Sequence, residues 1–473
     1  MGQKLWFSIS AVAVVAAGAA LGGSYYMGGR IQQGFAEGVQ RANQGPLKIE
    51  VVNYSRGALS SQAQTRWTYD IPGSDSIQFL VDHTIDHGPW PKGNAAQVHS
   101  RFALPEDAGE ELKTAFAGKP PFELSTTVGW NRTTSNLLTS PAATFKKEDS
   151  SFAWEGMRAE WDMPADLKAA QGTIHFPSFT AVGTDGNIAF KKVEFKFDVA
   201  QHQGYEFWTG PFSMQIDEAG IRPNEGDGEA ALVQGVSFDS DSRLKADVLE
   251  SWLKTKVKSV QLGESKASDV NIDMAFKNLD AQWFNATLQY FQSAHARAMA
   301  AIESDDDEAA SDVFPADTLE LLTKNIEQAL ARQPEIELKN FSLQTPEGSG
   351  ELSALVRYAG DGKNLGTILQ DIQASVKTAL PESMLRSIIE SRGKQSALAW
   401  TDETELSKEQ LQEMADLAKA HAEERITELK ESGTLQKDQN RLLMQLELSK
   451  GELQLNGKPI DGSQASLLAS SIL

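Results

Sequence analysis

Apolar and polar side chains alternate with a period of two over several long stretches of this chain, and this pattern constrains the fold most strongly. Three clear examples are residues 62–71, 77–86 and 192–199. Successive side chains of a strand point to opposite faces of the sheet. Each stretch therefore predicts a strand with one dry and one wet face, as in antiparallel sheets. The region 46–240 is predicted to be a long antiparallel meander, with a hairpin turn at Asp185 and Gly186.

The later part of the chain alternates strand patterns with helical ones. Strands are predicted at residues 270–276, 442–448 and 452–455, and a hairpin at 336–358. Helical spacing is found at residues 283–291, 365–379 and 406–429. The predicted fold class is α+β: an N-terminal transmembrane helix, then a long, curved, mainly antiparallel sheet shaped like a trough, with helices concentrated in the C-terminal half.

The N-terminal residues 5–27 form an apolar run without a charge, directly after Lys4. A helix needs about 20 apolar residues to cross a hydrocarbon core, so the run predicts a retained membrane anchor. A cleaved signal peptide is the alternative, because residues 17–19 imitate a cleavage site, but its apolar region is shorter, about 7–15 residues. Gly18 and Gly22 have a spacing that lets two helices approach closely, which makes them candidates for a transmembrane dimer contact.

With 473 residues, the chain is too long for one compact core. We expect five parts: a cytoplasmic tip (1–4), the transmembrane anchor (5–27), a juxtamembrane helix or linker (28–45), a β-rich region (46–260) and an α+β region (261–473). The positive charges at the N-terminus favour a cytoplasmic tip.

Composition excludes several classes of function. The net charge of −21 argues against nucleic acid as a partner, because binding phosphates needs clusters of Lys and Arg. It also argues against a body that lies on an anionic lipid surface. There is no cysteine, so disulfides, thiolate catalysis and iron–sulfur clusters are excluded together.

No sequence motif for catalysis or cofactor binding is found, and we expect neither a cofactor nor a catalytic residue. His83 and His87 have the i, i+4 spacing that binds a metal on a helix. The alternation around them indicates a strand, where four residues span about 13 Å, so they cannot share one ion. We therefore expect hydrogen-bonded core or edge histidines and no metal site.

Several short motifs, in order along the chain, resemble those of the bacterial YdgA-like proteins, a family of unknown function. They are residues 54–61 (Tyr-Ser-Arg-Gly-Ala-Leu-Ser-Ser), 86–91 (Asp-His-Gly-Pro-Trp-Pro), 121–124, 283–291 and 451–457. One departure is the pair Ala58 and Leu59, where bulkier or aromatic residues are expected. The signature residues are interpreted as markers of the fold; they are Tyr54, Arg56, Gly57, Ser60, Ser61, His87, Gly88, Pro89, Leu455, Asn456 and Gly457.

The resemblance implies a single-pass protein of the Gram-negative inner membrane with its bulk in the periplasm, and a homodimer is compatible with it. It implies no reaction. Two functions remain open. The first is a non-enzymatic envelope protein whose sheet binds or shields an apolar ligand such as lipid, by fold-level analogy. The second is a structural homodimer that supports envelope assembly or motility, with an envelope protein as partner. A hydrolase is a distant third.

Overall fold

The computed structural model describes residues 35, 39, 43, 47–57, 60–69, 76–87, 94–104, 110–147, 150–184, 186–223, 230–263, 265–304, 326–363, 365–398 and 408–461. They divide into two compact units. The first unit comprises Met1–Asp241 and Asn285–Glu320, and the second comprises Ser242–Phe284 and Leu321–Leu473. The predicted anchor, with Gly18 and Gly22, lies outside the described residues. No helix of the described part is long and apolar enough to cross a membrane.

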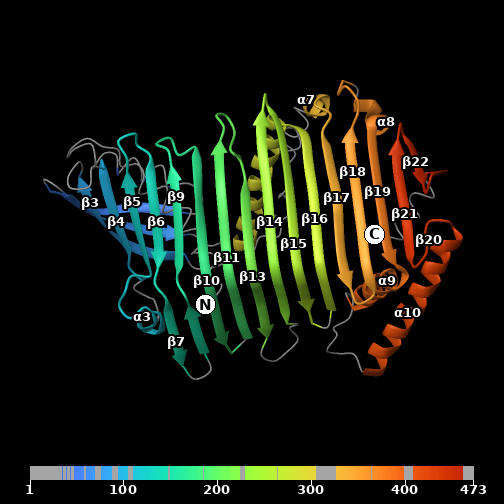
Figure 1. Ribbon diagram of the computed structural model, residues 1–473, viewed down its shortest axis with the longest axis horizontal. Helices are drawn as coiled ribbons and strands as arrows, with labels where there is room; N and C mark the ends of the chain where they lie inside the picture. Colours follow the sequence, from blue (N-terminus) through green and yellow to red (C-terminus); the bar gives the residue numbers. More distant parts are fainter. Residues whose placement is uncertain are drawn as a thin grey trace. The chain divides into compact units, whose positions relative to one another are not determined.

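The first unit is built around an antiparallel sheet (Figure 1). Its strands are β1 (Leu47–Arg56), β2 (Ser60–Tyr69), β3 (Ile77–His87), β4 (Ala96–Phe102), β5 (Phe122–Val128), β6 (Thr134–Ser140), β7 (Ala143–Lys147), β8 (Ser150–Trp154), β9 (Met157–Met163), β10 (Ala169–Gly183), β11 (Gly186–Gln201), β12 (Trp208–Thr209), β13 (Phe212–Pro223) and β14 (Ala231–Lys245). The last four residues of β14 belong to the second unit. A short helix, α3 (Glu110–Ala115), lies between β4 and β5.

The predicted meander is confirmed in this unit. Strands β1 to β6 pair consecutively, β6 pairs with β9, and the series continues through β10, β11, β13 and β14. The hairpin of β7 and β8 is attached through β8 to the second half of β10. The predicted turn is also found, because Gly183 and Gly186 form the last pair of the β10–β11 hairpin.

The second unit is a further antiparallel series with helices at its connections. Its strands are β15 (Val248–Leu262), β16 (Ser265–Asp280), β17 (Glu335–Thr345), β18 (Gly348–Tyr358), β19 (Ile372–Pro381), β20 (Gln436–Asp438), β21 (Arg441–Ser449), β22 (Glu452–Leu455) and β23 (Lys458–Ile460). Its helices are α4 (Ala281–Ser304, whose residues from Asn285 belong to the first unit), α7 (Ile326–Ala331), η1 (Leu365–Thr367), α8 (Ile368–Asp371), α9 (Glu382–Leu398) and α10 (Lys408–Glu431). Strands β15 to β19 pair consecutively, then β19 pairs with β21.

The predicted helix at residues 365–379 is wrong. Helix is confined to η1 and α8, and the chain then enters β19 at Ile372. Strand β19 pairs with β18 on one side and β21 on the other. These two ladders satisfy its backbone groups and override the local helical spacing. The other predicted helices, strands and hairpin of this region are found, so mainly antiparallel sheet with helices later in the chain is confirmed.

Each unit has its own hydrophobic core. The core of the first unit is rich in aromatic residues and includes Trp67, Phe102 and Phe122, whose rings meet edge to face. Phe35 and Val39, which precede β1, are also buried in it. The core of the second unit is smaller and packs the end of α10, at Leu429, against β21 and β22.

Candidate apolar binding face

Strands β10, β11, β13 and β14 place apolar side chains in rows that run across the strands. The registers give five uncharged rows: Phe197–Phe212–Ser240, Ile174–Phe195–Met214–Phe238, Phe176–Val193–Ile216–Val236, Phe179–Phe190–Ala219–Val233 and Ala181–Ile188–Ile221–Ala231. Most of their β10 and β11 members pack against the aromatic core of the first unit. We call these rows the apolar face of the first unit.

An irregularity at one level of all four strands keeps this face apolar. The registers pass over Lys192 in β11, Asp217 in β13 and Gly235 in β14 without changing the pairing beyond them. Lys192 and Gly235 have positive φ angles of 45° and 63°. Because the passed-over residues lie at the same level on every strand, the alternation restarts in the same phase on each of them. Apolar residues therefore stay together above and below this level.

The buried residues of the apolar face lie on β10 and β11, and its most exposed residue lies on β13. Phe176 on β10 is 7% exposed and Val193 on β11 is 8% exposed. Phe212 and Met214 on β13 and Phe238 on β14 are half-buried, and Ile221 on β13 is 53% exposed. The apolar face is thus closed at β10 and accessible at β13 and β14.

The rings on this face form a continuous series of contacts. Phe176 contacts Phe195 at 6.2 Å between ring centroids, Phe195 contacts Phe212 at 6.2 Å, and Phe212 contacts Phe238 at 5.9 Å. At the closed end, Trp154 of β8 contacts Phe176 at 6.0 Å. Trp154 itself is 3% exposed, and its buried indole N–H donates a hydrogen bond to Ser140 Oγ. The three accessible rings of Phe195, Phe212 and Phe238 form a strip. At its β10 end the strip meets the buried rings of Phe176 and Trp154.

The opposite face of these strands is polar. The Lys191 ammonium donates a hydrogen bond to Glu218, and so does the side-chain amide of Gln234. The bond from Lys191, followed by that from Gln234, lowers the pKa of the Glu218 carboxyl below its usual range. This face is wet and charged, so the dry and wet faces predicted from the alternation are clearly separated here.

At the other end of the first unit, the dry face contains buried histidines. The imidazole of His83 is hydrogen-bonded on both nitrogens, at 2.8 Å from Thr65 Oγ1 and 2.8 Å from Ser100 Oγ. Burial lowers the pKa of His83 to about 4, against a smaller opposing effect of Asp82. His87 Nε2 lies 2.9 Å from Ser61 Oγ. The two histidines thus have separate hydroxyl partners and are part of the core.

The second unit has a similar apolar face. Two uncharged rows cross six or more strands: Phe276–Ile336–Val356–Ala374–Leu448–Leu453 and Leu253–Met274–Leu338–Ala354–Val376–Leu446–Leu455. Ile336 is 45% exposed and Val356 is 48% exposed. Helix α9 covers one end of this face, where the Met384 sulfur lies 2.7 Å from the position of a Cβ on Gly350.

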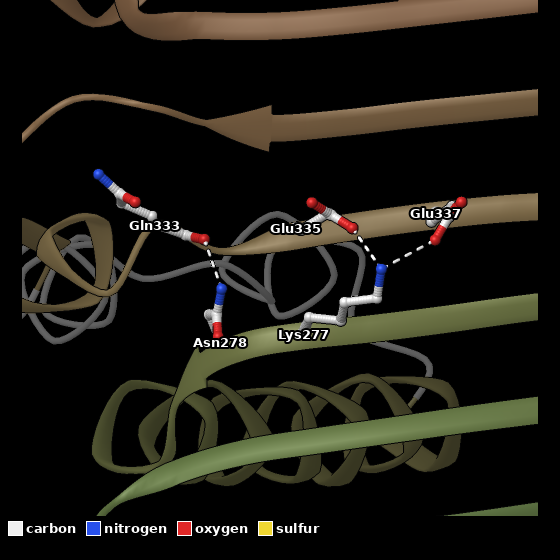
Figure 2. A network of polar contacts seen from close by, with 5 residues as sticks. All are labelled: Lys277, Asn278, Gln333, Glu335 and Glu337. Carbon is white, nitrogen blue, oxygen red and sulfur yellow. Dashed lines mark hydrogen bonds and ion pairs between the residues drawn. The ribbon is translucent and has the colours of Figure 1, made fainter.

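The other face of the second unit carries ion pairs between strands. Figure 2 shows Lys277 of β16 between two carboxylates of β17, with its ammonium 2.6 Å from Glu335 and 3.0 Å from Glu337. The bonds to Glu335 and then Glu337 raise the pKa of Lys277 above its ordinary value. Next to it, the Asn278 amide donates a hydrogen bond to the carbonyl of Gln333. These contacts fix the register of β16 and β17.

Two signature residues, Ser61 and His87, meet at one corner of the first unit, at the start of β2 and the end of β3. The buried Ser61 is bonded to His87, which joins two motifs 26 residues apart. In the hairpin before β2, the Gly57 N–H donates to the Ser60 carbonyl, and a Cβ at Gly57 would lie only 2.6 Å from that oxygen. The ring of Tyr54 packs on Phe35, 5.8 Å away between centroids.

The remaining signature residues have simpler surroundings. Arg56 and Ser60 are exposed strand ends, whereas Gly88 and Pro89 lie outside the described residues. In the second unit, Leu455 is buried in the core and Gly457 has a positive φ of 77°.

Asn456 joins three segments of the second unit. Its side-chain oxygen accepts a hydrogen bond from the Gln445 N–H at 2.8 Å. Its amide donates to the carbonyls of Gly433 and Thr434 at 2.8 and 2.9 Å. The loop after α10 is thereby fastened to β21 and β22. This geometry gives Asn456 a structural role.

The comparisons with known proteins cover nearly the whole chain. Residues 3–462 match the family described as bacterial protein of unknown function, DUF945. The chain belongs to this family. Protein YdgA of Escherichia coli (strain K12) is 21% identical over 480 residues, which cover 92% of this chain and 91% of the relative. The resemblance predicted from the motifs is therefore confirmed, and no solved structure matches. Membership of DUF945 assigns no reaction.

Sequence reasoning about this DUF945 protein missed the accessible aromatic strip. The alternation indicates that Phe195 faces the dry side of its strand, but it does not indicate which residues lie beside it on other strands. The signal that could have found the strip is the recurrence of phenylalanine in four neighbouring strands, at Phe176, Phe195, Phe212 and Phe238, at positions that differ by one row from each strand to the next.

Proposed function

We propose that this protein is a non-enzymatic protein of the cell envelope, anchored in the inner membrane, whose β-rich periplasmic body binds or shields an apolar ligand such as lipid. The observation that carries the proposal is the accessible apolar face of the first unit. Its rows contain no charged residue, and its β13 and β14 members are half-buried or exposed. Contiguous exposed apolar surface is uncommon on soluble proteins and often marks a binding site.

The energetics support an apolar occupant. Burying a large apolar side chain completely stabilises by roughly 1.5–3 kcal/mol, so covering side chains that are already largely buried yields about a third of that or less for each. Three residues of the strip, Phe195, Phe212 and Phe238, would together contribute a few kcal/mol. Contact with water is unfavourable for this surface, whereas contact with an acyl chain is favourable. The predicted membrane anchor would keep the body close to membrane lipids.

Native mass spectrometry of the full chain, solubilised in a mild detergent, tests the proposal. We expect masses of bound lipid on the wild-type protein. The variant Phe238→Asp introduces a charge on the apolar face and should reduce lipid occupancy at least tenfold. The matched control is Ser237→Asp, which adds the same charge on the neighbouring residue of β14, opposite Gln215 on the wet face.

Ligand-free masses of the wild-type protein in several preparations would contradict the proposal. Equal loss of lipid in both aspartate variants would remove the apolar face as the site, because the effect would then come from net charge or from a general loss of stability.

One observation favours the alternative, a structural homodimer. Among the described residues, β1 pairs with β2 alone, and its Val51 and Val52 are 42% and 46% exposed. The Asn43 side chain occupies the backbone groups of Ile49 on this edge, but a strand edge with exposed valines can pair with a second chain. However, the register shift between Val51 and Asn53 disrupts this edge, and the charged Lys48 and Glu50 are next to it, which disfavours edge pairing. Cross-linking in intact cells tests the dimer, and an exclusively monomeric protein would contradict it.

A further inference from the structure

We infer that the ligand of the apolar face in the first unit is a single unbranched acyl chain, which lies across β11, β13 and β14 with its methyl end toward β10. This inference rests on the proposed function and adds the shape and direction of the ligand. It combines three observations on the described residues: the direction of the apolar rows, the absence of charge within them, and the closure of one end.

The direction of the rows sets the shape of the ligand. Phe195, Phe212 and Phe238 succeed one another across neighbouring strands and not along one strand. Neighbouring strands are about 4.8 Å apart, so these three residues extend over roughly 10 Å. The series has one ring on each strand, and a flexible chain of methylene groups can contact all three rings in succession.

The closure sets the direction. Phe176 and Trp154 continue the series of ring contacts beyond Phe195, but both are buried, with exposures of 7% and 3%. A ligand that follows the rings therefore meets packed side chains at Phe176. Only an apolar end can be placed against them without leaving a polar group unpaired, which costs about 1–3 kcal/mol.

The opposite end of the strip is suited to a polar head group. In the row next to Phe238, β14 contributes the half-buried Ser240, opposite Phe212. The hydroxyl at this position can hydrogen-bond to a polar head group. The chain direction follows from these two ends: methyl group at β10 and β11, head group at β14.

Photocross-linking with two fatty acids of the same length tests the inference on the full-length solubilised protein. One probe carries a diazirine at its methyl end, and the other carries it next to the carboxylate. We expect peptide mapping to find the first probe on β10 and β11, around Phe176 and Phe195, and the second on β14, around Phe238. The variant Phe212→Ala should lower the yield of both cross-links at least fivefold. The matched control Gln215→Ala, on the wet face of the same strand, should leave both yields unchanged.

The outcomes separate this inference from the proposed function. The same labelled peptides for both probes, or a reversed pattern, would overturn the orientation while leaving lipid binding intact. Stronger competition by a rigid sterol than by an unlabelled fatty acid would overturn the linear shape of the ligand. No cross-link with either probe, together with ligand-free native masses, would remove the proposed function itself.

Discussion

The Nε2 atom of His83 lies 2.8 Å from the Oγ1 atom of Thr65, inside the core of the first unit. The hydroxyl of Ser100 binds the other ring nitrogen, so a neutral imidazole can use both nitrogens, one as donor and one as acceptor. Only 4% of His83 is exposed. A charge on this ring would be poorly solvated, and its pKa is accordingly lowered to about 4, chiefly by burial.

This pKa predicts acid sensitivity. An unfolded histidine titrates near 6.5, so between about pH 6.5 and pH 4 the unfolded chain binds a proton at His83 that the folded chain does not bind. Stability is therefore complete above pH 6.5 and falls as the pH decreases toward 4, by roughly 3 kcal/mol from this group. Urea unfolding at pH 7 and pH 4.5 measures it. His83→Gln should flatten the dependence, and the exposed His99→Gln should not; equal pH slopes in both variants would contradict the assignment.

Substitution of Gly172 in β10 by alanine is expected to cause a steric clash. A Cβ there would lie 2.3 Å from the Glu160 carbonyl oxygen and 2.6 Å from the Cβ of Trp161. The strand beside it would have to shift, so we expect Gly172→Ala to destabilise the protein by about 1–3 kcal/mol. Gly183→Ala in the same strand is the matched control, because nothing lies within 4 Å of its Cβ position. Thermal unfolding of both variants provides the comparison, and equal melting temperatures would show that the sheet yields at Gly172.

The parts of the fold that sequence reasoning predicted are those where a dry face dictates the pattern. Strands such as β2 and β3 have one buried face, so their alternation is visible in the sequence. Strand β19 is different, because its residues alternate weakly and its state is decided by β18 and β21 on either side. The secondary structure of such a segment is determined by neighbouring strands that are distant in the sequence. The local sequence pattern contains no information about those strands.

The same limit applies to the candidate site. The dry face of each strand is a local property, but the contact between Phe212 and Phe238 depends on the register of β13 and β14. That register passes over Gly235, whose positive φ of 63° is not visible as a pattern. The resemblance to a family identified the membership of the chain but named no ligand, so the apolar face could only be found from the structure.

Substitution of the buried Asp280 tests how much its carboxylate contributes to stability. Its carboxylate accepts hydrogen bonds from the N–H groups of Gln282 and Trp283 at the start of α4, at 3.1 and 3.0 Å. It also lies 3.5 Å from Arg332 Nε and accepts a bond from the amide of Gln328 at 3.1 Å. Asp280→Ala removes the helix cap and leaves Arg332 without this carboxylate, so we expect a loss of about 2–4 kcal/mol.

Asp280→Asn separates the two effects. The amide oxygen can still cap α4, so this variant should lose only the part that comes from the charge. Urea unfolding of the two variants measures the difference, and an alanine variant no less stable than the asparagine variant would show that the cap contributes nothing.

Asn456 allows the backbone and side-chain contributions of one signature residue to be separated. Its φ of 51° lies in the left-handed region, which glycine adopts freely and alanine at a cost of about 1–2 kcal/mol. Asn456→Gly keeps this conformation and removes the three side-chain hydrogen bonds to Gln445, Gly433 and Thr434. At about 1 kcal/mol for each bond, we expect a loss of roughly 2–3 kcal/mol, and Asn456→Ala should lose about 1–2 kcal/mol more. Denaturant unfolding measures the totals, and hydrogen exchange should show faster exchange at the Gln445 N–H in both variants. A glycine variant as stable and as protected as the wild type would mean that Asn456 acts through its backbone conformation alone.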